Sequence, residues 1–209
     1  VQIGMPISLQ LVVVSVGLTF IQRAVNGFGK TMVASFTVGQ RIEMYINLPC
    51  NAFQTTLATY AGQNIGAGKM SRVKLGTKQA LIMSFSSTVV ISLIVWFYAP
   101  EIIKLFGISE QAAVYCIDHI RTIAFVNLLL SLYVPVFGVF QGANHCAMPT
   151  VVATVALSTR VIVTYLFKDS PYFGYSIIWW NGLFGFSLAL TITWYFYFSG
   201  KWQKDAVIK

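Results

Sequence analysis

The sequence predicts an all-α membrane protein that folds as a bundle of six transmembrane helices. Composition is the first observation, since 56% of the 209 residues are apolar and only 10% are charged, against about 25% charged residues in a soluble domain. The second is a set of long runs without Asp, Glu, Lys or Arg: residues 1–22, 44–68, 79–100, 122–159 and 170–200. A helix needs about 20 apolar residues to cross the hydrocarbon core of a membrane, and these runs provide them.

Six helices are expected in a single transmembrane lobe over residues 1–209. In chain order they span about 3–25, 31–62, 79–98, 112–142, 147–167 and 175–198. The first helix ends where Gly27 and Gly29 flank a short turn. The second is long, and Pro49 near its middle predicts a kink because proline removes a backbone hydrogen bond.

Two charged stretches separate the helices in the middle of the chain. Residues 63–78 are expected to form a loop, and their cations are Lys69, Arg72, Lys74 and Lys78. Residues 100–110 are expected to form a short amphipathic connector. The fourth helix is again long, and its central proline, Pro135, predicts a second kink.

Charged residues inside the later helices require an explanation. Arg160 lies within an apolar run of the fifth helix, where a structural role is favoured, because a charge in lipid must snorkel outwards or meet a partner. Asp118, His119 and Arg121 stand near the start of the fourth helix, and we expect water to solvate that start.

The distribution of Lys and Arg predicts the orientation of the bundle. Seven of them lie in the 63–78 stretch and the C-terminal tail, whereas three, Lys30, Lys104 and Lys168, lie on the opposite side. The positive-inside rule therefore places both chain ends in the cytoplasm, in a multi-pass protein of the cell membrane (the inner, cytoplasmic membrane). Basic residues gathered at helix ends also explain the net charge of +8 better than nucleic-acid binding does.

The sequence contains no pattern that indicates an enzyme or a metal site. Cys50, Cys116 and Cys146 are scattered, without a pair at metal-binding spacing. His119 and His145 lack a carboxylate cluster beside them, and no nucleophile–base–orienter set is evident. We therefore expect no catalysis, no metal and no cofactor other than a coupling ion, H⁺ or Na⁺.

Polar residues in two helices indicate an internal cavity. Arg41 and Glu43 lie roughly 16–20 Å beyond Lys30, at 1.5 Å per residue, and charges at that depth must face protein or water. Around the two prolines stand further polar residues: Asn47, Asn51 and Gln54 near the first, Asn127 and Tyr133 near the second. A site for a proton, an ion or a substrate is one interpretation. A structural ion pair with Arg160 or Arg121, with prolines that only shape packing, is the other.

Several motifs resemble the C-terminal half of a multidrug and toxic compound extrusion (MATE) transporter. They are G-M-P-I-S-L-Q at Gly4–Gln10, V-A-S-F-T-V-G-Q-R-I-E at Val33–Glu43, G-Q-N-I-G-A-G-K at Gly62–Lys69, and F-Q-G-A-N at Phe140–Asn144 followed by Pro149. The resemblance covers essentially the whole chain, and the Val33–Glu43 segment with its Gly-rich ending is the most specific part.

The resemblance implies one lobe of a twelve-helix exporter built from two six-helix lobes. Organic, often cationic, compounds then cross between the lobes by alternating access while sodium or protons return. Some members carry a glutamate and an aspartate for cation coupling where this chain has apolar residues near Val14 and Leu130, so that sodium site is not supported. Coupling then resides in the other lobe or involves Glu43.

We therefore predict part of a cation-coupled multidrug antiporter. The candidate residues of the substrate and ion pathway are Gln10, Arg41, Glu43, Asn47, Asn51, Gln54, Asn127 and Tyr133. Expected partners are membrane lipid, small-molecule substrates, and a missing N-terminal six-helix lobe or a second copy of this chain. Two alternatives stay open: a flippase of lipid-linked sugars from a related family, and a non-transporting half-protein that serves as a membrane scaffold.

Overall fold

The computed structural model describes residues 4–204, and every regular element in that range is a helix. In chain order these are α1 (Gly4–Asn26), α2 (Lys30–Gly66), α3 (Met70–Phe97), α4 (Ala99–Lys104), α5 (Glu110–Ser131), α6 (Val134–Gly142), α7 (Ala147–Phe167), the short 3₁₀ helix η1 (Gly174–Ser176), α8 (Ile177–Ser199) and α9 (Lys201–Lys204). The start that we predicted for the first helix, residue 3, lies outside the described residues.

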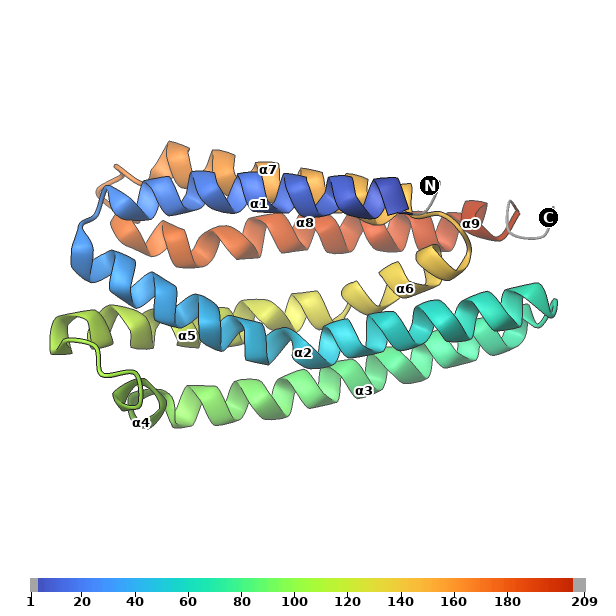
Figure 1. Ribbon diagram of the computed structural model, residues 1–209, viewed down its shortest axis with the longest axis horizontal. Coiled ribbons are helices and arrows are strands. Elements are labelled where there is room, and N and C mark those ends of the chain that lie inside the picture. The colour runs from blue at the N-terminus through green and yellow to red at the C-terminus, as the bar shows by residue number, and fades with distance from the viewer. Residues whose placement is uncertain (1–3, 205–209) are drawn as a thin grey trace.

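The long helices run along one common direction and form two groups (Figure 1). α1, α7 and α8 pack together, and α2, α3, α5 and α6 form the second group, which α5 joins to α8. The start of α1, the turn between α2 and α3, and α9 all lie at the same end of the bundle (Figure 1). Residues close to both chain ends are therefore on one side, as an even number of crossings requires.

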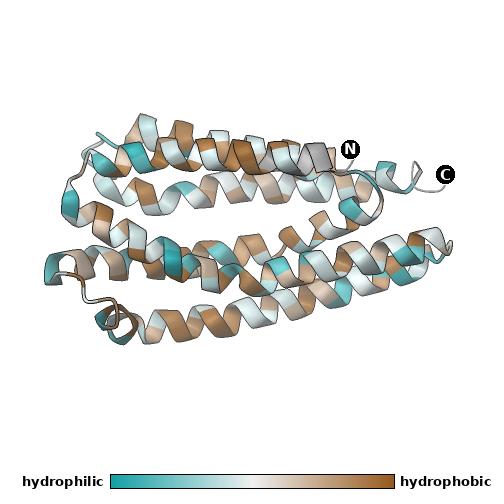
Figure 2. Ribbon diagram, viewed as in Figure 1, coloured by the Kyte–Doolittle hydropathy of each residue, from teal (hydrophilic) through white to brown (hydrophobic). Residues whose placement is uncertain are grey.

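Four segments are long and apolar enough to cross a membrane: Met70–Phe97, Glu110–Gly142, Ala147–Phe167 and Gly174–Ser199. The apolar part found in α1, Leu11–Asn26, is shorter than a full span, and α2 carries more polar residues. Both nevertheless lie alongside the other four (Figure 1). Figure 2 shows hydrophilic residues at the ends of the bundle and along part of α2, with hydrophobic residues between. The chain is thus an all-α membrane bundle.

The outermost helix, α3, has polar side chains inside and apolar side chains outside. Ser84 and Thr88 are fully buried, whereas Ile82 and Phe97 are 57% and 71% exposed. A helix at a water-facing surface shows the opposite pattern. This face of α3 is therefore one that lipid would cover.

The predicted loop over residues 63–78 is wrong, because α2 continues to Gly66 and α3 already begins at Met70. The two helices are joined by a tight turn in which Gly68 has a φ of 69°, a conformation that glycine adopts without steric cost. Of the cations that suggested a loop, Arg72, Lys74 and Lys78 are exposed in the first turns of α3, and Lys69 is exposed just before it. Lys and Arg are good helix formers, so a helix that leaves the lipid can continue through them into water.

The predicted fourth helix, residues 112–142, is two helices in the structure. α5 ends at Ser131, and α6 begins at Val134 with Pro135 in its first turn. Between them Tyr133 leaves the helical conformation, with φ of −131° and ψ of −29°. The expected kink at Pro135 is therefore a full break.

The carbonyl groups at this break need partners, because an unsatisfied backbone group is costly inside a membrane protein. The indole Nε1 of Trp194 in α8 donates to the carbonyl oxygen of Leu132 at 3.2 Å. The break is thus stabilised by a side chain from another helix. At Pro49, by contrast, α2 stays one continuous helix and changes direction about half-way along its length (Figure 1).

Small residues let α6 lie directly against α2. A Cβ at Gly142 would stand 2.6 Å from the carbonyl oxygen of Ala58, and a Cβ at Gly138 would collide with the carbonyl oxygen of Gln54. Glycines four residues apart let two membrane helices approach closely. This contact holds the broken helix beside the polar part of α2.

Candidate functional site

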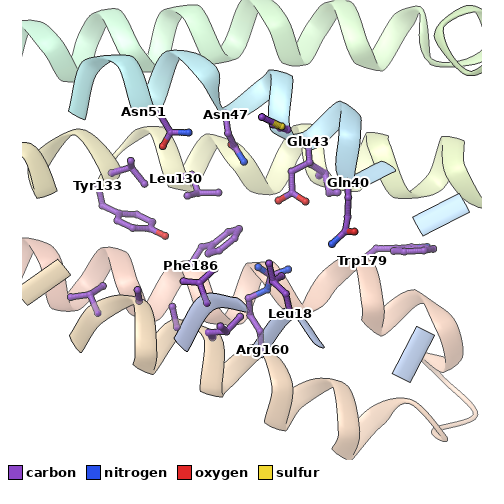
Figure 3. Close-up of a pocket in the computed structure, with 18 of the residues that line it drawn as sticks. Leu18, Gln40, Glu43, Asn47, Asn51, Leu130, Tyr133, Arg160, Trp179 and Phe186 are labelled. Atoms are coloured by element: carbon purple, nitrogen blue, oxygen red, sulfur yellow. The ribbon is translucent and has the colours of Figure 1, made fainter. Parts of the chain in front are cut away.

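A cavity of about 440 Å³ lies between the two groups of helices. Its walls come from α1, α2, α5, α6, α7 and α8, and the side chains labelled in Figure 3 reach towards it from opposite sides. Much of the lining is apolar. The residues with polar groups along it are Gln40, Glu43, Asn47, Asn51, Gln54, His119, Tyr133, Arg160 and Trp179.

One wall is a row of polar side chains on α2, which we call the cavity stripe: Gln40, Glu43, Asn47, Asn51 and Gln54. These residues recur every three or four positions, so the helical repeat of 3.6 residues places them on a single face. The change of direction in the middle of α2 falls within this stripe. The stripe therefore follows the wall of the cavity on both sides of the bend.

Arg41, a predicted residue of the pathway, lies outside the cavity lining. It follows Gln40 by one residue, and one residue turns a helix by about 100°. Its side chain is exposed on another face of α2. Arg41 and Glu43 are therefore not two members of one site.

The remaining candidates have different positions. Tyr133 lines the cavity from the break between α5 and α6 and is 4% exposed. Asn127 is fully buried and lies apart from the cavity lining, and its amide has no hydrogen-bond partner among the described residues. Gln10 belongs to α1, but its side chain lies outside the described residues. The structure thus brings five of the eight candidates together.

Two opposite charges face each other across the cavity. Glu43 projects from α2, and Arg160 projects from α7 on the other side (Figure 3). No ion pair within 4.0 Å joins them in the described part of the chain, and the Glu43 carboxylate accepts no hydrogen bond there. The ion pair predicted between Glu43 and Arg160 is therefore not formed in this structure.

Arg160 is held by α8 rather than by a carboxylate. Its Nε donates to Oδ1 of Asn181 at 2.7 Å, and its guanidinium carbon lies 5.0 Å from the centre of the Phe186 ring. Asn181 is itself fixed, since its Nδ2 donates to Oγ1 of Thr164 at 3.1 Å. Close packing at Gly185, where a Cβ would stand 2.5 Å from Cγ of Arg160, lets the arginine stem pass along α8. The sequence favours Arg160 as a structural residue and offers it as an ion-pair partner of Glu43, but no local pattern places it in the cavity wall.

An aromatic stack forms another part of the wall. The ring of His119 lies 4.0 Å from that of Trp179 and 5.4 Å from that of Phe36, in stacked geometry. His119 is 2% exposed, so the expected solvated start of the fourth helix is wrong for this residue. Gly39 makes the arrangement possible, because a Cβ there would overlap the imidazole ring.

The signal that sequence analysis missed is the period of the polar residues in α2. Gln40 precedes Glu43 by three residues and Asn47 by seven, which is a spacing for one helical face. Applying that spacing would have added Gln40 and removed Arg41. For His119 and Trp179 no such signal exists, since their meeting depends on how α5 and α8 pack.

The cavity contains the positions where the family resemblance places coupling carboxylates. Val14 and Leu130 both line it, and neither side chain can bind a cation or release a proton. In the described part of the chain no group of three or more His, Cys, Asp or Glu residues is arranged to hold a metal ion. Glu43 is the carboxylate in the lining.

Comparison with known proteins finds a matching family model and related sequences. Residues 6–166 match the family model described as MatE. The chain is 28% identical over 143 residues, 68% of its length and 32% of the relative's, to the probable multidrug resistance protein YpnP of Bacillus subtilis. It is 20% identical over 208 residues, 99% of its length and 45% of the relative's, to the probable multidrug resistance protein NorM of Thermotoga maritima.

Solved structures share the fold. A MATE crystal structure in a bent conformation matches with a TM-score of 0.89 and 19% identity, over 98% of this chain and 46% of that one. Outward-facing and inward-facing MATE transporters match with TM-scores of 0.87 and 0.84 and identities of 14% and 20%. The former match covers 96% of this chain and 45% of the other, the latter 92% and 45%. The chain thus spans less than half the length of the proteins it matches.

Proposed function

Because this chain belongs to the MatE family, as the match over residues 6–166 shows, we propose that it acts as one lobe of a cation-coupled multidrug antiporter. The exporter then consists of this lobe and a second six-helix lobe, with organic, often cationic, compounds crossing between them. The observation that carries the proposal is the cavity of about 440 Å³, whose wall combines aromatic and apolar surface with one carboxylate. Such a lining suits compounds that are both apolar and cationic.

Alternating access requires each lobe to move as a single unit. The fold of this chain matches both an outward-facing and an inward-facing transporter closely, which supports a lobe that keeps its internal structure in both states. In related transport folds the two halves rock against each other around a central site. We propose the same for this lobe and its partner.

Glu43 is the residue that we propose for coupling. Its carboxylate faces the cavity without a hydrogen bond or ion pair among the described residues, so it is available to a proton, to Na⁺ or to the cationic group of a substrate. Exchange between these at one carboxylate is a direct way to couple their movements. Arg160, on the opposite wall, disfavours more than one cation at a time.

Glu43→Gln tests this role, because it keeps the shape of the side chain and removes its charge. In proteoliposomes that contain the chain and its partner lobe, we expect efflux of a fluorescent organic cation driven by a pH or sodium gradient to be abolished. Glu101→Gln is the matched control, since Glu101 is an exposed carboxylate of α4 away from the cavity. Unchanged efflux by the Glu43 variant would remove Glu43 from the mechanism. Applying each gradient alone identifies the ion.

The flippase alternative receives less support from the lining. A pyrophosphate-linked sugar needs several cationic side chains along its path. Among the residues that line the described cavity, Arg160 alone carries a positive charge. The scaffold alternative predicts no efflux from any combination of lobes. The proteoliposome experiment therefore separates it from transport.

We further propose that the end of the bundle that holds the start of α1, the turn between α2 and α3, and α9 faces the cytoplasm, in the inner membrane. Lys69, Arg72, Lys74 and Lys78 gather at that end, together with Lys201. A Lys74→Cys variant should then react with a membrane-impermeant thiol reagent only from the cytoplasmic side. Labelling from the outside of intact cells would invert the proposed orientation.

A further inference from the structure

A second pocket, of about 530 Å³, opens at the end of the bundle where α3 ends and α8 begins. We call it the interface pocket, and the residues that matter are Trp96 of α3, Asp118, Arg121 and Phe125 of α5, and Trp180 of α8. It lies at the level of helix ends, where tryptophan is enriched in membrane proteins because its ring suits the headgroup region. The pocket is separate from the proposed transport site except for Trp179, which lines both.

The interface pocket holds one positive and one negative side chain, each free to bind a ligand. Arg121 is oriented by its Nε, which donates to the carbonyl oxygen of Trp96 at 3.4 Å, and its guanidinium carbon lies 5.8 Å from the centre of the Trp96 ring. The terminal nitrogens of Arg121 and the carboxylate of Asp118 have no ion-pair partner in the described residues. A guanidinium held in this way suits a phosphate, which it binds through two parallel hydrogen bonds.

An apolar groove of about 140 Å³ continues from the interface pocket between α3 and α5. The two share Trp96 and Phe125, and the groove adds Val89, Leu93, Ala124 and Leu128, together with Ser92, whose side chain is buried. Trp96 and Phe125 are 45% and 54% exposed. A site that is charged at the membrane surface and mainly apolar towards the membrane centre has the polarity of a phospholipid.

We propose that the interface pocket and this groove bind a membrane phospholipid whose headgroup carries both a phosphate and an ammonium group. The phosphate meets Arg121, and the ammonium lies between the Asp118 carboxylate and the faces of the tryptophans, which attract cations. One acyl chain follows the groove past Leu93. A headgroup with a net negative charge is disfavoured, because Asp118 repels it.

Native mass spectrometry of the full chain in detergent tests the proposal with two lipids, phosphatidylethanolamine and phosphatidylglycerol. We expect the chain to retain phosphatidylethanolamine preferentially. Arg121→Gln should weaken that binding about tenfold, the loss expected for one charge-assisted hydrogen-bond pair. Arg23→Gln is the matched control, since Arg23 is an exposed arginine in the last turn of α1 and does not line the pocket. Equal binding by the two variants would overturn the proposal.

Two further variants test the two ends of the lipid separately. Asp118→Asn should reduce the preference for phosphatidylethanolamine over phosphatidylglycerol, whereas a stronger preference would contradict the assignment of the ammonium group. Val89→Trp fills the groove and should release the lipid, while Val90→Trp, on the exposed neighbouring position, should retain it. Retention by both would show that the groove holds no acyl chain. None of these measurements depends on transport, so the proposal can fail while the transport function stands.

Discussion

Two rows of polar side chains run along neighbouring helices, and their surroundings differ. The cavity stripe of α2 consists of amides and one carboxylate that face an open cavity. The second row, which we call the hydroxyl stripe, consists of Thr77, Ser84, Thr88 and Ser92 on α3, and all four are buried. Both rows follow the helical repeat, so their spacing alone does not distinguish them.

The difference lies in how each type of polar group is satisfied. In the hydroxyl stripe, Oγ1 of Thr77 donates to the carbonyl oxygen of Val73 at 2.7 Å, and Oγ1 of Thr88 lies 3.4 Å from Sγ of Cys50 on α2. Oγ of Ser84 donates to the same Sγ, whereas Oγ of Ser92 has no partner among the described residues. Short hydroxyl side chains can bond to their own helix or to a close neighbour, so they serve packing. Long amides and carboxylates cannot do this as easily and need water or a ligand.

The cavity stripe shows this need directly. Of its five side chains, only Gln54 has a hydrogen bond to a described residue, at 3.4 Å from its Nε2 to Oε1 of Gln141. Oδ1 of Asn47 is buried without a partner. In this chain the amides and the carboxylate of the cavity stripe line the cavity, whereas three of the four hydroxyls of the hydroxyl stripe have partners on their own helix or on α2.

Ser84→Leu should give the largest loss of stability, because it forces a large side chain into a fully buried position beside Cys50. Overpacking of this kind costs roughly 1–3 kcal/mol, which a lower midpoint of thermal unfolding in detergent would report. The exposed position two residues later provides the control, since Ser86→Leu should leave the midpoint unchanged. Equal midpoints for the two variants would mean that α3 does not pack through its hydroxyl stripe.

Asn47→Leu should separate function from stability. The substitution removes a polar group of the cavity wall, and the loss of one hydrogen bond to a bound substrate, about 1 kcal/mol, predicts efflux reduced about fivefold. Thermal stability should not fall, because the buried Oδ1 of Asn47 has no partner to lose. A fall in the midpoint of thermal unfolding as large as that of Ser84→Leu would instead assign Asn47 to packing and contradict the distinction between the two stripes.

Thr88→Val should have the smallest effect, since it keeps the shape of the side chain and removes only the contact with Sγ of Cys50. Hydrogen bonds between membrane helices average about 0.6 kcal/mol, and efflux should be unchanged. A double-mutant cycle with Cys50→Ala isolates the pair. A coupling free energy above roughly 2 kcal/mol would give the hydroxyl stripe a greater role than packing.

Sequence reasoning succeeded where a property depends on local composition. The charge-free runs indicate membrane helices, and Pro135 indicates a disturbance of the fourth helix, because proline lacks a backbone donor wherever it stands. Reasoning failed at the ends of helices. Lys74 and Lys78 look like loop residues, yet a helix that continues past the lipid into water keeps them in α3.

The candidate site was predicted in part for the same reason. Glu43, Asn47 and Gln54 are spaced for one helical face, so their common wall follows from the sequence of α2. Arg160 lies more than 100 residues further along the chain, and its place opposite Glu43 results from the packing of α7 against α8. No local pattern carries that information.

The sequence by itself determined that the helices lie in a membrane and which face of α2 is polar, since both depend on which residues follow one another within a single helix. The tertiary structure alone decided which charge stands opposite Glu43 and that His119 stacks on Trp179 inside the wall. These are contacts between helices, and they depend on where small residues such as Gly39 and Gly185 permit a close approach. The physical reason is that a membrane gives each helix its direction, whereas side-chain shape decides the rotation and depth at which helices meet.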